Sequence, residues 1–410
     1  MSRPLRLAYL AGQHPAIHHP YILDEIQFLR KAGIDLHVVS VSLPDRPPDR
    51  LSLVEREEAA RTFYIKAAGP GKILAAHFAT LSRRPGRYLR GLLAALALAR
   101  GNPRKSLYSV FYFAEAVVLG NWMISRELSH IHIHYATTVG LLAVRIFPVT
   151  MSISIHGSAE FLDPAGFHLT EKIAASVFVR AISQYGRSQL MKASPYPEWE
   201  KIEVARLGID PLAFPVRPFR ENPVPFEIVS IGRLSPEKGQ HVLVLALAHL
   251  VRQGRDVRLR FLGDGPDRLE LEQHLAALEI RDRVVFEGAF PHASLPHLCQ
   301  EADVCALTSF LEGLPLTLME AMAMEIPCVA PRITGIPELI QDGTDGILFA
   351  PSDEVQIAEA IARLMDDPAL RRRIGQAARR KVLEDYDFSR NARAFAASLQ
   401  SRLNSIDRHS

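Results

Sequence analysis

The stretch Phe226-Glu-Ile-Val-Ser-Ile-Gly232, followed by Arg233-Leu-Ser-Pro-Glu-Lys-Gly239, decides the fold. An apolar run that ends in a glycine turn predicts a strand, and the apolar periodicity of 240–253 predicts a helix directly after it. Strands separated by single helices lie parallel in one sheet, so this half predicts a doubly wound α/β domain. The alternation continues toward the C-terminus, with further strands expected at 257–262, 283–286, 304–307, 327–330 and 346–349.

The first half of the chain has the same alternation. Apolar runs predict strands at 5–11, 34–41, 130–135, 150–155 and 178–183. Dense prolines between 195 and 225 are incompatible with helices and sheet interiors, so this segment is expected to connect two domains. We therefore predict an α/β protein of two doubly wound, Rossmann-like domains that face a central cleft. Its expected parts are an N-terminal, acceptor-side domain at 1–195, a linker at 196–225, a second domain at 226–387, and a last helix at about 388–406 that joins the N-terminal domain.

Composition narrows the class of protein. The chain has 410 residues, 48% of them hydrophobic and 23% charged, which is typical of a globular protein. Lys+Arg 48 nearly balance Asp+Glu 45, so no nucleic-acid partner is expected. The three cysteines cannot form a disulfide framework. The N-terminal apolar run is too short for a signal peptide, and the longest uncharged apolar run, 92–99, is far below the roughly 20 residues of a membrane span. These features predict a cytoplasmic protein.

Charge is nevertheless uneven along the chain. No acidic residue occurs between Glu58 and Glu115, and the basic residues of segment 61–105 alternate with apolar ones at helical spacing. Such a pattern favours contact with an anionic membrane surface. The alternative is an ordinary solvated helix face. The basic residues are Arg61, Lys66, Lys72, Arg83, Arg84, Arg87, Arg90, Arg100, Arg104 and Lys105.

Two stretches of the second half have residues suited to a nucleotide sugar. Arg233 and Lys238 flank the expected start of a helix, where backbone N–H groups and two cations would hold a diphosphate. Glu312 lies in the loop after the strand 304–307, and Glu320 follows on the next helix. Carboxylates can accept hydrogen bonds from neighbouring sugar hydroxyls. The alternatives are a capped helix with exposed basic residues and a solvent-facing acid.

Three histidines at alternate positions, His130, His132 and His134, would share one face of a strand. A metal site is one interpretation of this pattern. No carboxylate or cysteine lies nearby at ligand spacing, so we expect no metal. His134 is instead expected at the edge of the cleft and the other two in packing.

Taken together, these motifs resemble those of the family-4 retaining glycosyltransferases of GT-B fold. The resemblance rests on Gly232-Arg233…Lys238-Gly239, Phe261-Leu-Gly-Asp-Gly265-Pro, Val285-Phe-Glu-Gly288, Glu312-Gly-Leu-Pro…Glu320 and Thr334-Gly-Ile-Pro-Glu338. In the first half, Pro20-Tyr-Ile-Leu-Asp-Glu25, His132-Ile-His134, Ser154-Ile-His156-Gly157 and Val204-Ala-Arg-Leu-Gly-Ile-Asp210 resemble the branch that builds bacterial exopolysaccharides of the colanic-acid type.

The resemblance implies a role for each matching residue. Arg233 and Lys238 would hold the donor diphosphate, Glu312 the donor sugar, and Glu320 the ribose, with Glu312 and His156 as catalytic residues. The chain departs from the family twice: Gly12 stands alone where two glycines are frequent, and Thr334 replaces a frequent glycine. The remaining donor-side residues would be Gly232, Gly265, Gly313, Leu314 and Pro315, and the acceptor-side residues Gly12, His14, His134 and Arg206.

The implied activity is transfer of a hexose, with retained configuration, from a UDP- or GDP-sugar to a glycan or a polyprenyl-diphosphate-linked acceptor. The nucleotide diphospho-sugar would be a co-substrate, and neither a cofactor nor an obligatory metal is expected. The expected location is the cytoplasm, at the inner face of the plasma membrane. Two alternatives remain open: a sugar-nucleotide epimerase or hydrolase of the same fold, and a non-catalytic scaffold that binds nucleotide sugars.

Overall fold

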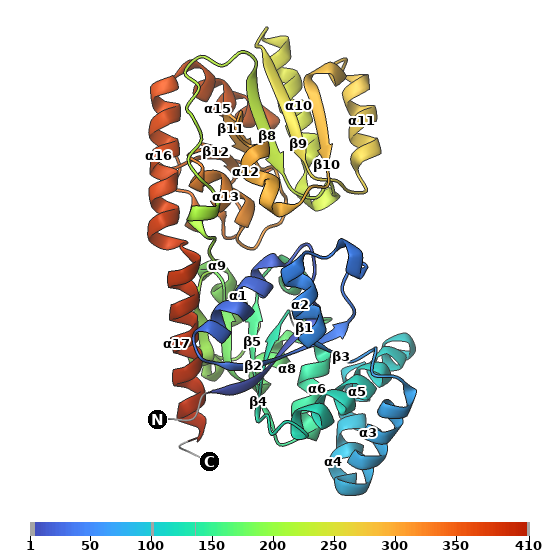
Figure 1. Cartoon of the computed structure of the whole chain (residues 1–410). Coiled ribbons are helices and arrows are strands. Elements are labelled where there is room, and N and C mark those ends of the chain that lie inside the picture. The colour runs from blue at the N-terminus through green and yellow to red at the C-terminus, as the bar shows by residue number, and fades with distance from the viewer. Residues whose placement is uncertain (1–4, 100–101, 136, 408–410) are drawn as a thin grey trace. The chain divides into compact units, whose positions relative to one another are not determined.

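The computed structural model describes residues 5–99, 102–135 and 137–407, and it divides the chain into two compact units (Figure 1). The first unit comprises residues up to Ala205 and those from Ala392 onward, and the second unit comprises Arg206–Asn391. The expected linker at 196–225 contains the point where the chain passes between the units: residues 196–205 belong to the first unit and 206–225 to the second. Within this segment the short strand β7 (Ile202–Val204) forms between two proline-rich stretches and pairs with β6 (Ser176–Ala181).

The first unit is built on a seven-stranded parallel sheet in the order β3-β2-β1-β4-β5-β6-β7. Since the order reverses between β1 and β4, the carboxyl ends of these two strands form the topological switch point, where α/β sheets bind ligands. The other strands are β1 (Arg6–Gln13), β2 (Asp35–Ser42), β3 (Phe63–Tyr64), β4 (His130–His134) and β5 (Thr150–Ile155).

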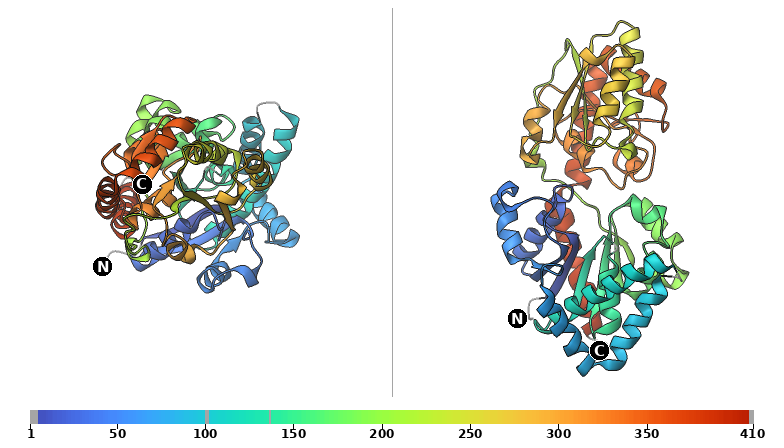
Figure 2. Two further views of the ribbon diagram at one scale, coloured as in Figure 1. Left: turned by 90° about the horizontal axis from the view of Figure 1, so that it is seen from above. Right: turned by 90° about the vertical axis from the view of Figure 1, so that its right-hand side faces the viewer.

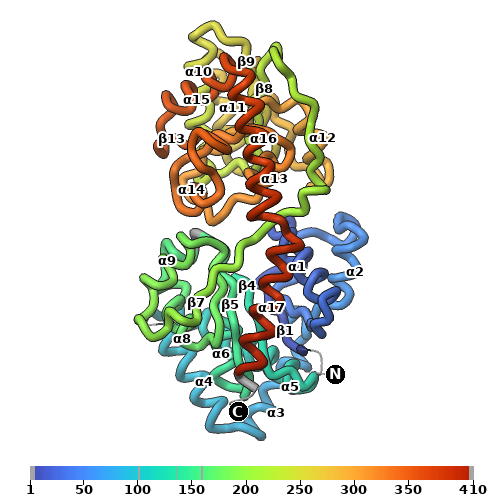
Figure 3. The backbone as a smooth tube through the Cα atoms, turned by 90° about the vertical axis from the view of Figure 1, so that its left-hand side faces the viewer, coloured from blue at the N-terminus to red at the C-terminus, as the bar shows by residue number. Residues whose placement is uncertain are grey.

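Helices cover both faces of this sheet. On one face, α1 (Pro20–Lys31) and α17 (Phe388–Asp407) bury Leu7, Tyr9 and Phe178 together with Phe395 and Leu399. Figure 3 shows α17 running along this sheet. Residues of this last helix from Ala392 onward belong to the first unit. The remaining helices are α2 (Leu53–Arg61), α6 (Thr138–Ile146), α7 (Ser158–Leu162), α8 (Leu169–Ala175) and α9 (Gln184–Lys192).

Three consecutive helices, α3 (Pro70–Arg83), α4 (Pro85–Leu98) and α5 (Pro103–Ile124), pack against one another between β3 and β4 (Figure 2). By length and composition α5 could span a membrane, but half of its apolar window is buried inside the unit. Its second half, including Phe113 and Leu119, packs in the core beneath α6. We therefore interpret α5 as a core helix.

The second unit is a six-stranded parallel sheet in the order β10-β9-β8-β11-β12-β13. Its switch point lies between β8 and β11, and β8 is buried along its whole length. The strands are β8 (Phe226–Ile231), β9 (Val257–Leu262), β10 (Val284–Gly288), β11 (Val304–Ala306), β12 (Cys328–Pro331) and β13 (Ile347–Phe349). The helices are α10 (Gln240–Arg252), α11 (Arg268–Ala277), α12 (Leu295–Leu298), α13 (Leu316–Ala323), α14 (Ile336–Leu339), α15 (Glu354–Asp366) and α16 (Pro368–Asp385).

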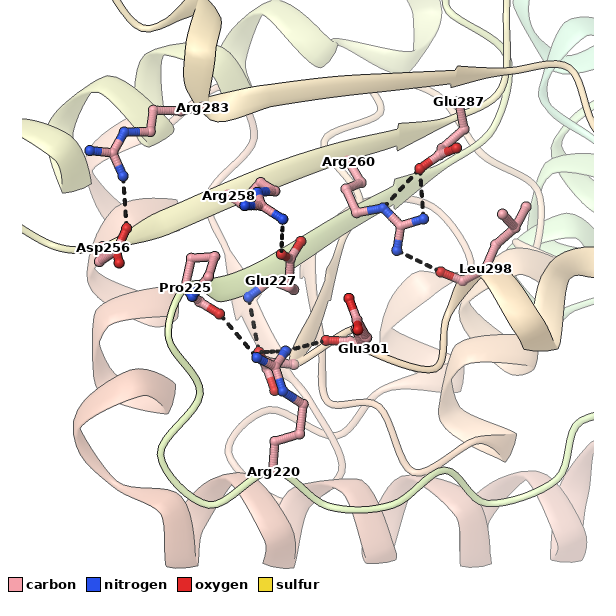
Figure 4. Close-up of polar contacts among 11 residues, drawn as sticks. Arg220, Pro225, Glu227, Asp256, Arg258, Arg260, Arg283, Glu287, Leu298 and Glu301 are labelled. Carbon is pink, nitrogen blue, oxygen red and sulfur yellow. Dashed lines mark hydrogen bonds and ion pairs between the residues drawn. The ribbon is translucent and has the colours of Figure 1, made fainter.

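Charged side chains pair across the strands at one edge of this sheet (Figure 4). Glu227 on β8 lies opposite Arg258 on β9 in the register, and their side chains are 3.1 Å apart. Arg260 on β9 contacts Glu287 on β10 at 2.6 Å. Opposite charges on neighbouring strands stabilise a sheet face that is partly open to solvent. Arg220 fixes the segment before β8 by donating to the carbonyl oxygen of Glu301 at 2.7 Å (Figure 4).

Candidate functional site

The loop from β8 to α10 contains the first of the predicted donor-side residues. Gly239 begins α10 with a φ of +61°, and a Cβ there would lie 2.5 Å from the carbonyl oxygen of Thr308. Only glycine permits both this conformation and this approach. The loop is therefore held against the segment that follows β11, where the Phe310 N–H donates to the carbonyl oxygen of Glu237 at 2.9 Å.

Lys238 and Glu312 meet at this junction. The Lys238 ammonium donates to Glu312 Oε1 at 2.7 Å, and the Ser309 hydroxyl donates to the same oxygen at 2.6 Å. Glu312 is buried, whereas the side chain of Lys238 is 26% exposed. The cation is thus fixed by a buried carboxylate and still faces solvent beside the N-terminus of α10. A helix N-terminus with an adjacent cation is a site for a phosphate group.

Arg233 lies in the same loop, with its carbonyl oxygen accepting from Gln240 Nε2 at 2.8 Å. The Arg233 side chain is exposed. A hydrogen bond from Ser235 lowers the pKa of Glu237, and the positive charges of Lys238 and Arg233 add to this lowering. Both predicted cations therefore lie close enough to Glu237 for their fields to overlap.

Glu320 is on α13, which begins directly after Pro315 as the sequence predicts. Its carboxylate is buried, and its Oε1 lies 2.8 Å from Nε2 of His292. Gly313, Leu314 and Pro315 form the end of the loop that leads into this helix, and the side chain of Leu314 is buried. One loop and one helix thus carry all the donor-side residues that the sequence places after β11.

Gly265 belongs to the loop that follows β9. A Cβ at Gly265 would lie 2.1 Å from the carbonyl oxygen of Leu234, and one at Gly263 would lie 2.0 Å from that of Gly232. The backbone of this loop therefore touches the backbone of the Arg233 loop. Gly232 itself has a φ of +144°, a conformation that glycine adopts without strain.

Three of the four predicted acceptor-side residues, Gly12, His14 and His134, lie in the first unit near its switch point, as does the predicted catalytic residue His156. His156 follows β5, and its Nε2 lies 2.8 Å from Nδ1 of His134 at the end of β4. Both rings are buried, and they stack with their centroids 4.8 Å apart. Burial lowers the pKa of both imidazoles, and for His156 the lowering is large. These two histidines are therefore neutral near pH 7.

Gly12 lies at the end of β1, and His14 directly follows that strand, at the same edge of the sheet. His14 is buried, and burial lowers its pKa to about 4. A Cβ at Gly12 would reach Cγ2 of Thr137 at 4.0 Å. Within the described residues, three buried atoms near this edge lack a hydrogen-bond partner: His14 Nε2, Thr137 Oγ1 and His156 Nδ1. Buried polar atoms normally have partners, so these atoms mark a place for a polar ligand or for water.

Arg206 is placed elsewhere. It opens the second unit, where its guanidinium lies 3.9 Å from Glu338 and 5.9 Å from the centre of the Tyr386 ring. The structure thus groups Arg206 with residues of the second unit, whereas the sequence pattern grouped it with the acceptor side.

The histidines of β4 have hydroxyl partners on β5. His130 lies 2.8 Å from both Thr150 Oγ1 and Ser152 Oγ, and His132 lies 2.8 Å from both Ser152 Oγ and Ser154 Oγ. This ladder follows from the register, in which His130, His132 and His134 face Thr150, Ser152 and Ser154. Among the described residues no group of His, Cys, Asp and Glu has the arrangement of a metal site.

Sequence reasoning missed three residues that complete these sites. Ser309 and His292 contact the two donor-side glutamates, and Glu25 on α1 contacts His134 at 3.3 Å. Ser309 lies in the loop that follows β11, which is a signal that could have been used. Glu25 ends the motif Pro20–Glu25 quoted above, but its contact with His134 joins positions 109 residues apart, and that of His292 with Glu320 joins positions 28 residues apart.

Comparison with known proteins agrees with this organisation. Residues 217–381 match the family model described as "Glycosyl transferases group 1". Alpha-D-kanosaminyltransferase of Streptomyces kanamyceticus is 38% identical over 149 residues, which are 36% of this chain and 39% of that protein. The protein named "Putative colanic acid biosynthesis glycosyltransferase WcaL" of Salmonella typhimurium is 26% identical over 412 residues, covering 97% of this chain and all of that protein.

The fold is also that of solved glycosyltransferases. The structure of HepE of Anabaena in complex with UDP and glucose aligns with a TM-score of 0.72 and 19% identity, over 97% of this chain and 100% of that one. The predicted GT-B fold class, with two parallel-sheet Rossmann-like units, is confirmed. These comparisons support a glycosyltransferase of group 1, with the matched family region inside the second unit.

Proposed function

We propose that this protein is a retaining hexosyltransferase of surface polysaccharide synthesis that uses a nucleotide diphospho-sugar as donor. The observation that carries the proposal is the contact of Lys238 with Glu312 at the N-terminus of α10. It puts a fixed cation and helix N–H groups, which suit a diphosphate, beside a buried carboxylate that can bind hydroxyls. HepE, whose structure was solved with UDP and glucose, and the relative named for colanic acid biosynthesis support the same donor class and process.

In this proposal the diphosphate contacts Lys238, Arg233 and the first turn of α10. Glu312 accepts hydrogen bonds from the donor sugar, and Glu320 accepts them from the ribose. The acceptor hydroxyl attacks the anomeric carbon from the side on which the diphosphate leaves. The bond from that carbon to the phosphate oxygen breaks, the new glycosidic bond forms, and the hydroxyl proton passes to the departing phosphate. Lys238 and the helix N-terminus stabilise the charge that develops on the leaving group, so metal is not required.

The test is binding and turnover of UDP-, GDP-, ADP- and dTDP-sugars in the presence of EDTA. We expect one nucleotide to bind, and Lys238→Ala to weaken that binding by about 10–100-fold, the value of a lost charge-assisted hydrogen bond. Lys381→Ala is the matched control, because Lys381 pairs with Asp385 on α16 instead. Binding that requires metal, or that Lys238→Ala leaves unchanged, would contradict the proposed donor site.

Product analysis separates transfer from its alternatives. A hexosyltransferase forms a glycoside only when an acceptor is present, and the proton coupling constant at the anomeric carbon of the product reports retention. Turnover of the donor alone, without a glycoside, would favour the epimerase or hydrolase. Binding without any turnover, with glycan and lipid-linked acceptors both supplied, would favour the scaffold.

We also propose that the acceptor is lipid-linked and that helices α3 and α4 bring the enzyme to an anionic membrane. These helices expose large apolar side chains, with Phe78 75%, Leu74 69% and Leu93 65% exposed. The basic residues Lys72, Arg83, Arg87 and Arg90 are exposed on the same two helices, and the sequence has no acid from residue 59 to 114. Apolar groups beside cations match an anionic lipid surface. Arg100, also part of the predicted basic segment, lies outside the described residues.

Co-sedimentation with phosphatidylglycerol and phosphatidylcholine vesicles tests this surface. We expect binding to the anionic vesicles only, with a loss of at least about tenfold in the triple variant Arg83→Glu, Arg87→Glu, Arg90→Glu, at about 1 kcal/mol per charge. The matched control replaces the exposed Arg373, Arg380 and Arg393 with Glu. Equal loss in both triple variants would mean that net charge alone is responsible, and equal binding to both vesicles would exclude electrostatic attraction.

A further inference from the structure

A buried chain of polar contacts crosses the first unit from β6 to the end of β5. Arg180 Nη1 donates to Glu25 Oε2 at 2.5 Å, and Tyr9 donates to Glu25 Oε1. The Tyr9 hydroxyl in turn contacts Nε2 of His134, and Nδ1 of His134 lies 2.8 Å from Nε2 of His156. All five side chains are almost fully buried. The chain ends at Nδ1 of His156, which is buried and has no partner within the described residues.

The chemistry of these groups assigns a direction to every hydrogen bond. A guanidinium can only donate and a carboxylate can only accept, so Glu25 accepts from both Arg180 and Tyr9. The hydrogen of Tyr9 is then committed to Glu25, and the Tyr9 oxygen must accept from His134. Nε2 of His134 therefore carries a hydrogen, which is also consistent with its distance of 3.3 Å from Glu25 Oε1.

The charge states of Glu25 and His134 determine which of the other ring nitrogens carry a hydrogen. Burial alone would raise the pKa of Glu25, but Arg180, His134 and Tyr9 outweigh it and hold that pKa well below its ordinary value. Burial lowers the pKa of His134 despite the contact with Glu25, because Arg180 already balances the carboxylate. A neutral His134 with a hydrogen on Nε2 has a lone pair on Nδ1, so it must accept from Nε2–H of His156. This leaves the lone pair of a neutral His156 on Nδ1.

We propose that Glu25, with Tyr9 and His134, is a positioning device that fixes the tautomer of His156 and presents the unprotonated Nδ1 to a hydroxyl group of a sugar substrate. The contact with a sugar hydroxyl rests on the proposed function, whereas the assignment of the His156 tautomer does not. The ligand at this atom is a neutral hydroxyl donor, since an unprotonated nitrogen repels the oxygens of a phosphate or a carboxylate.

The neighbouring histidines show what the carboxylate adds. The ring nitrogens of His130 and His132 hydrogen-bond to hydroxyl groups of Thr150, Ser152 and Ser154 on β5. The Thr150 hydroxyl also donates to the carbonyl oxygen of Ser129 at 3.4 Å, so that carbonyl, and not Glu25, sets the direction of this ladder. His132 has the same strand, the same face and similar burial as His134, and it therefore serves as an internal control.

The primary test is a ¹⁵N NMR spectrum of the full chain with labelled histidine, without substrate, near pH 7. Two-bond couplings to the ring protons distinguish protonated from unprotonated nitrogens, and the signals are assigned by their loss in His156→Gln and His134→Gln. We expect the hydrogen on Nε2 in both rings. A hydrogen on Nδ1 of His156, or a doubly protonated His134, would overturn the inference whatever the activity of the enzyme.

Two variants test the role of the carboxylate. In Glu25→Gln, Arg180 attracts the amide oxygen, so the amide NH₂ faces Tyr9 and His134 and reverses the chain. We expect the hydrogen of His156 to move to Nδ1 while the spectrum of His132 is unchanged. In Tyr9→Phe, Glu25 Oε1 still accepts from His134, so we expect the tautomer to be kept. An unaltered His156 in Glu25→Gln, or a reversed one in Tyr9→Phe, would contradict the proposal. The wild-type spectrum remains decisive if Glu25→Gln does not fold.

Kinetics connect the tautomer with substrate. If a sugar hydroxyl donates to His156, Glu25→Gln lowers kcat/KM by about 10–100-fold, and Tyr9→Phe by less than about fivefold, with UDP affinity unchanged in both. Reversal of the tautomer with unchanged kcat/KM would overturn the contact with the sugar and leave the tautomer assignment standing. Failure of the proposed function is distinct, because the wild type itself would then form no glycoside.

Discussion

Thr334 lies in a backbone conformation that suits glycine. Its φ is +46°, and its hydroxyl is buried without a partner within the described residues. A β-branched residue in this region costs of the order of 1–3 kcal/mol. We expect Thr334→Gly to raise the free energy of unfolding by about 1 kcal/mol, as measured by urea denaturation, because relief of strain exceeds the backbone entropy that glycine loses. Thr317→Gly, inside α13, is the control and should lower stability; a loss of stability in Thr334→Gly would show that the position is not strained.

Gly265 depends on close contact rather than on φ. A Cβ there would overlap the carbonyl oxygen of Leu234 at 2.1 Å, and backbone cannot move as a flexible side chain can. We expect Gly265→Ala to lower the free energy of unfolding by about 1–3 kcal/mol, the usual cost of overpacking, and to displace the Arg233 loop. Gly157→Ala is the matched control, since nothing lies within 4 Å of its Cβ position and its φ of −169° is accessible to alanine. Thermal melting of both variants tests this prediction. Equal stability of the two variants would contradict the close approach of Gly265 to the Leu234 carbonyl oxygen.

Individual residues also show how much of the candidate site could be predicted from the sequence. Lys238 and Glu312 could be selected because each lies at a position where strand, turn and helix meet. Their contact could not be predicted from spacing, since 74 residues separate them. His292 and Glu25 contact buried groups that are distant in sequence, and although Glu25 belongs to a recognised motif, neither contact could be predicted from a local pattern. Thr334 was recognised as a departure from a family pattern, but the strain there needs a backbone to be seen.

Among the elements, buried strands were the most predictable. The expected strand at 150–155 has the same bounds as β5, and that at 257–262 the same bounds as β9. Their continuous apolar or alternating patterns reflect burial inside a parallel sheet. The two-residue strand β3 and the three-residue β7 have too few residues for a period. Both pair with longer strands, so tertiary contacts rather than local sequence determine that these segments form strands.

The histidine ladder on β4 predicts how stability depends on pH. Burial lowers the pKa of His130 to about 3, and it is also the main cause that lowers the pKa of His14, after β1, to about 4. The unfolded chain therefore binds more protons between about pH 6.5 and pH 4, and stability must fall on acidification through this range. Each such histidine contributes a slope of about 1.4 kcal/mol per pH unit.

Urea denaturation between pH 7 and pH 5 measures this slope. The window excludes Glu25, whose lowered pKa gives stability that is lost only below its ordinary value of 4.5. His130→Gln removes one group that binds a proton in the unfolded chain but not in the folded protein. We therefore expect the free energy of unfolding to depend less steeply on pH, by up to about 1.4 kcal/mol per pH unit. His297→Gln at an exposed position serves as the control. An unchanged slope in His130→Gln would show that this imidazole is charged in the folded protein.

At the scale of the whole molecule, the sequence predicts two Rossmann-like units correctly, and its expected linker at 196–225 contains the residue at which the chain passes between them without identifying it. The chain passes from the first unit to the second after Ala205 and returns after Asn391. The return is visible as an amphipathic pattern in the last helix, which buries Phe395 and Leu399 against β1. The sequence does not show where the chain first passes into the second unit, because a short strand precedes that point and proline-rich coil surrounds it. Periodicity reports burial within a unit and carries little information about where one core ends.

Because the two units have separate cores, we can predict which loops a bound nucleotide protects from hydrogen exchange. The donor-side loops 232–240, 263–266 and 307–315 all belong to the second unit, and the loops after β1 and β5 belong to the first. We expect UDP at 100 times its Kd to slow amide hydrogen exchange by up to about 100-fold in the three donor-side loops, which corresponds to about 2.7 kcal/mol of binding linkage. Exchange at 12–14 and 157–160 should not change with UDP alone, because those segments hold acceptor-side groups. The same measurement on Lys238→Ala, at equal UDP concentration, should show weaker protection of the donor-side loops only. Protection confined to the first unit would place the nucleotide on the other switch point and would reverse the roles of the two units.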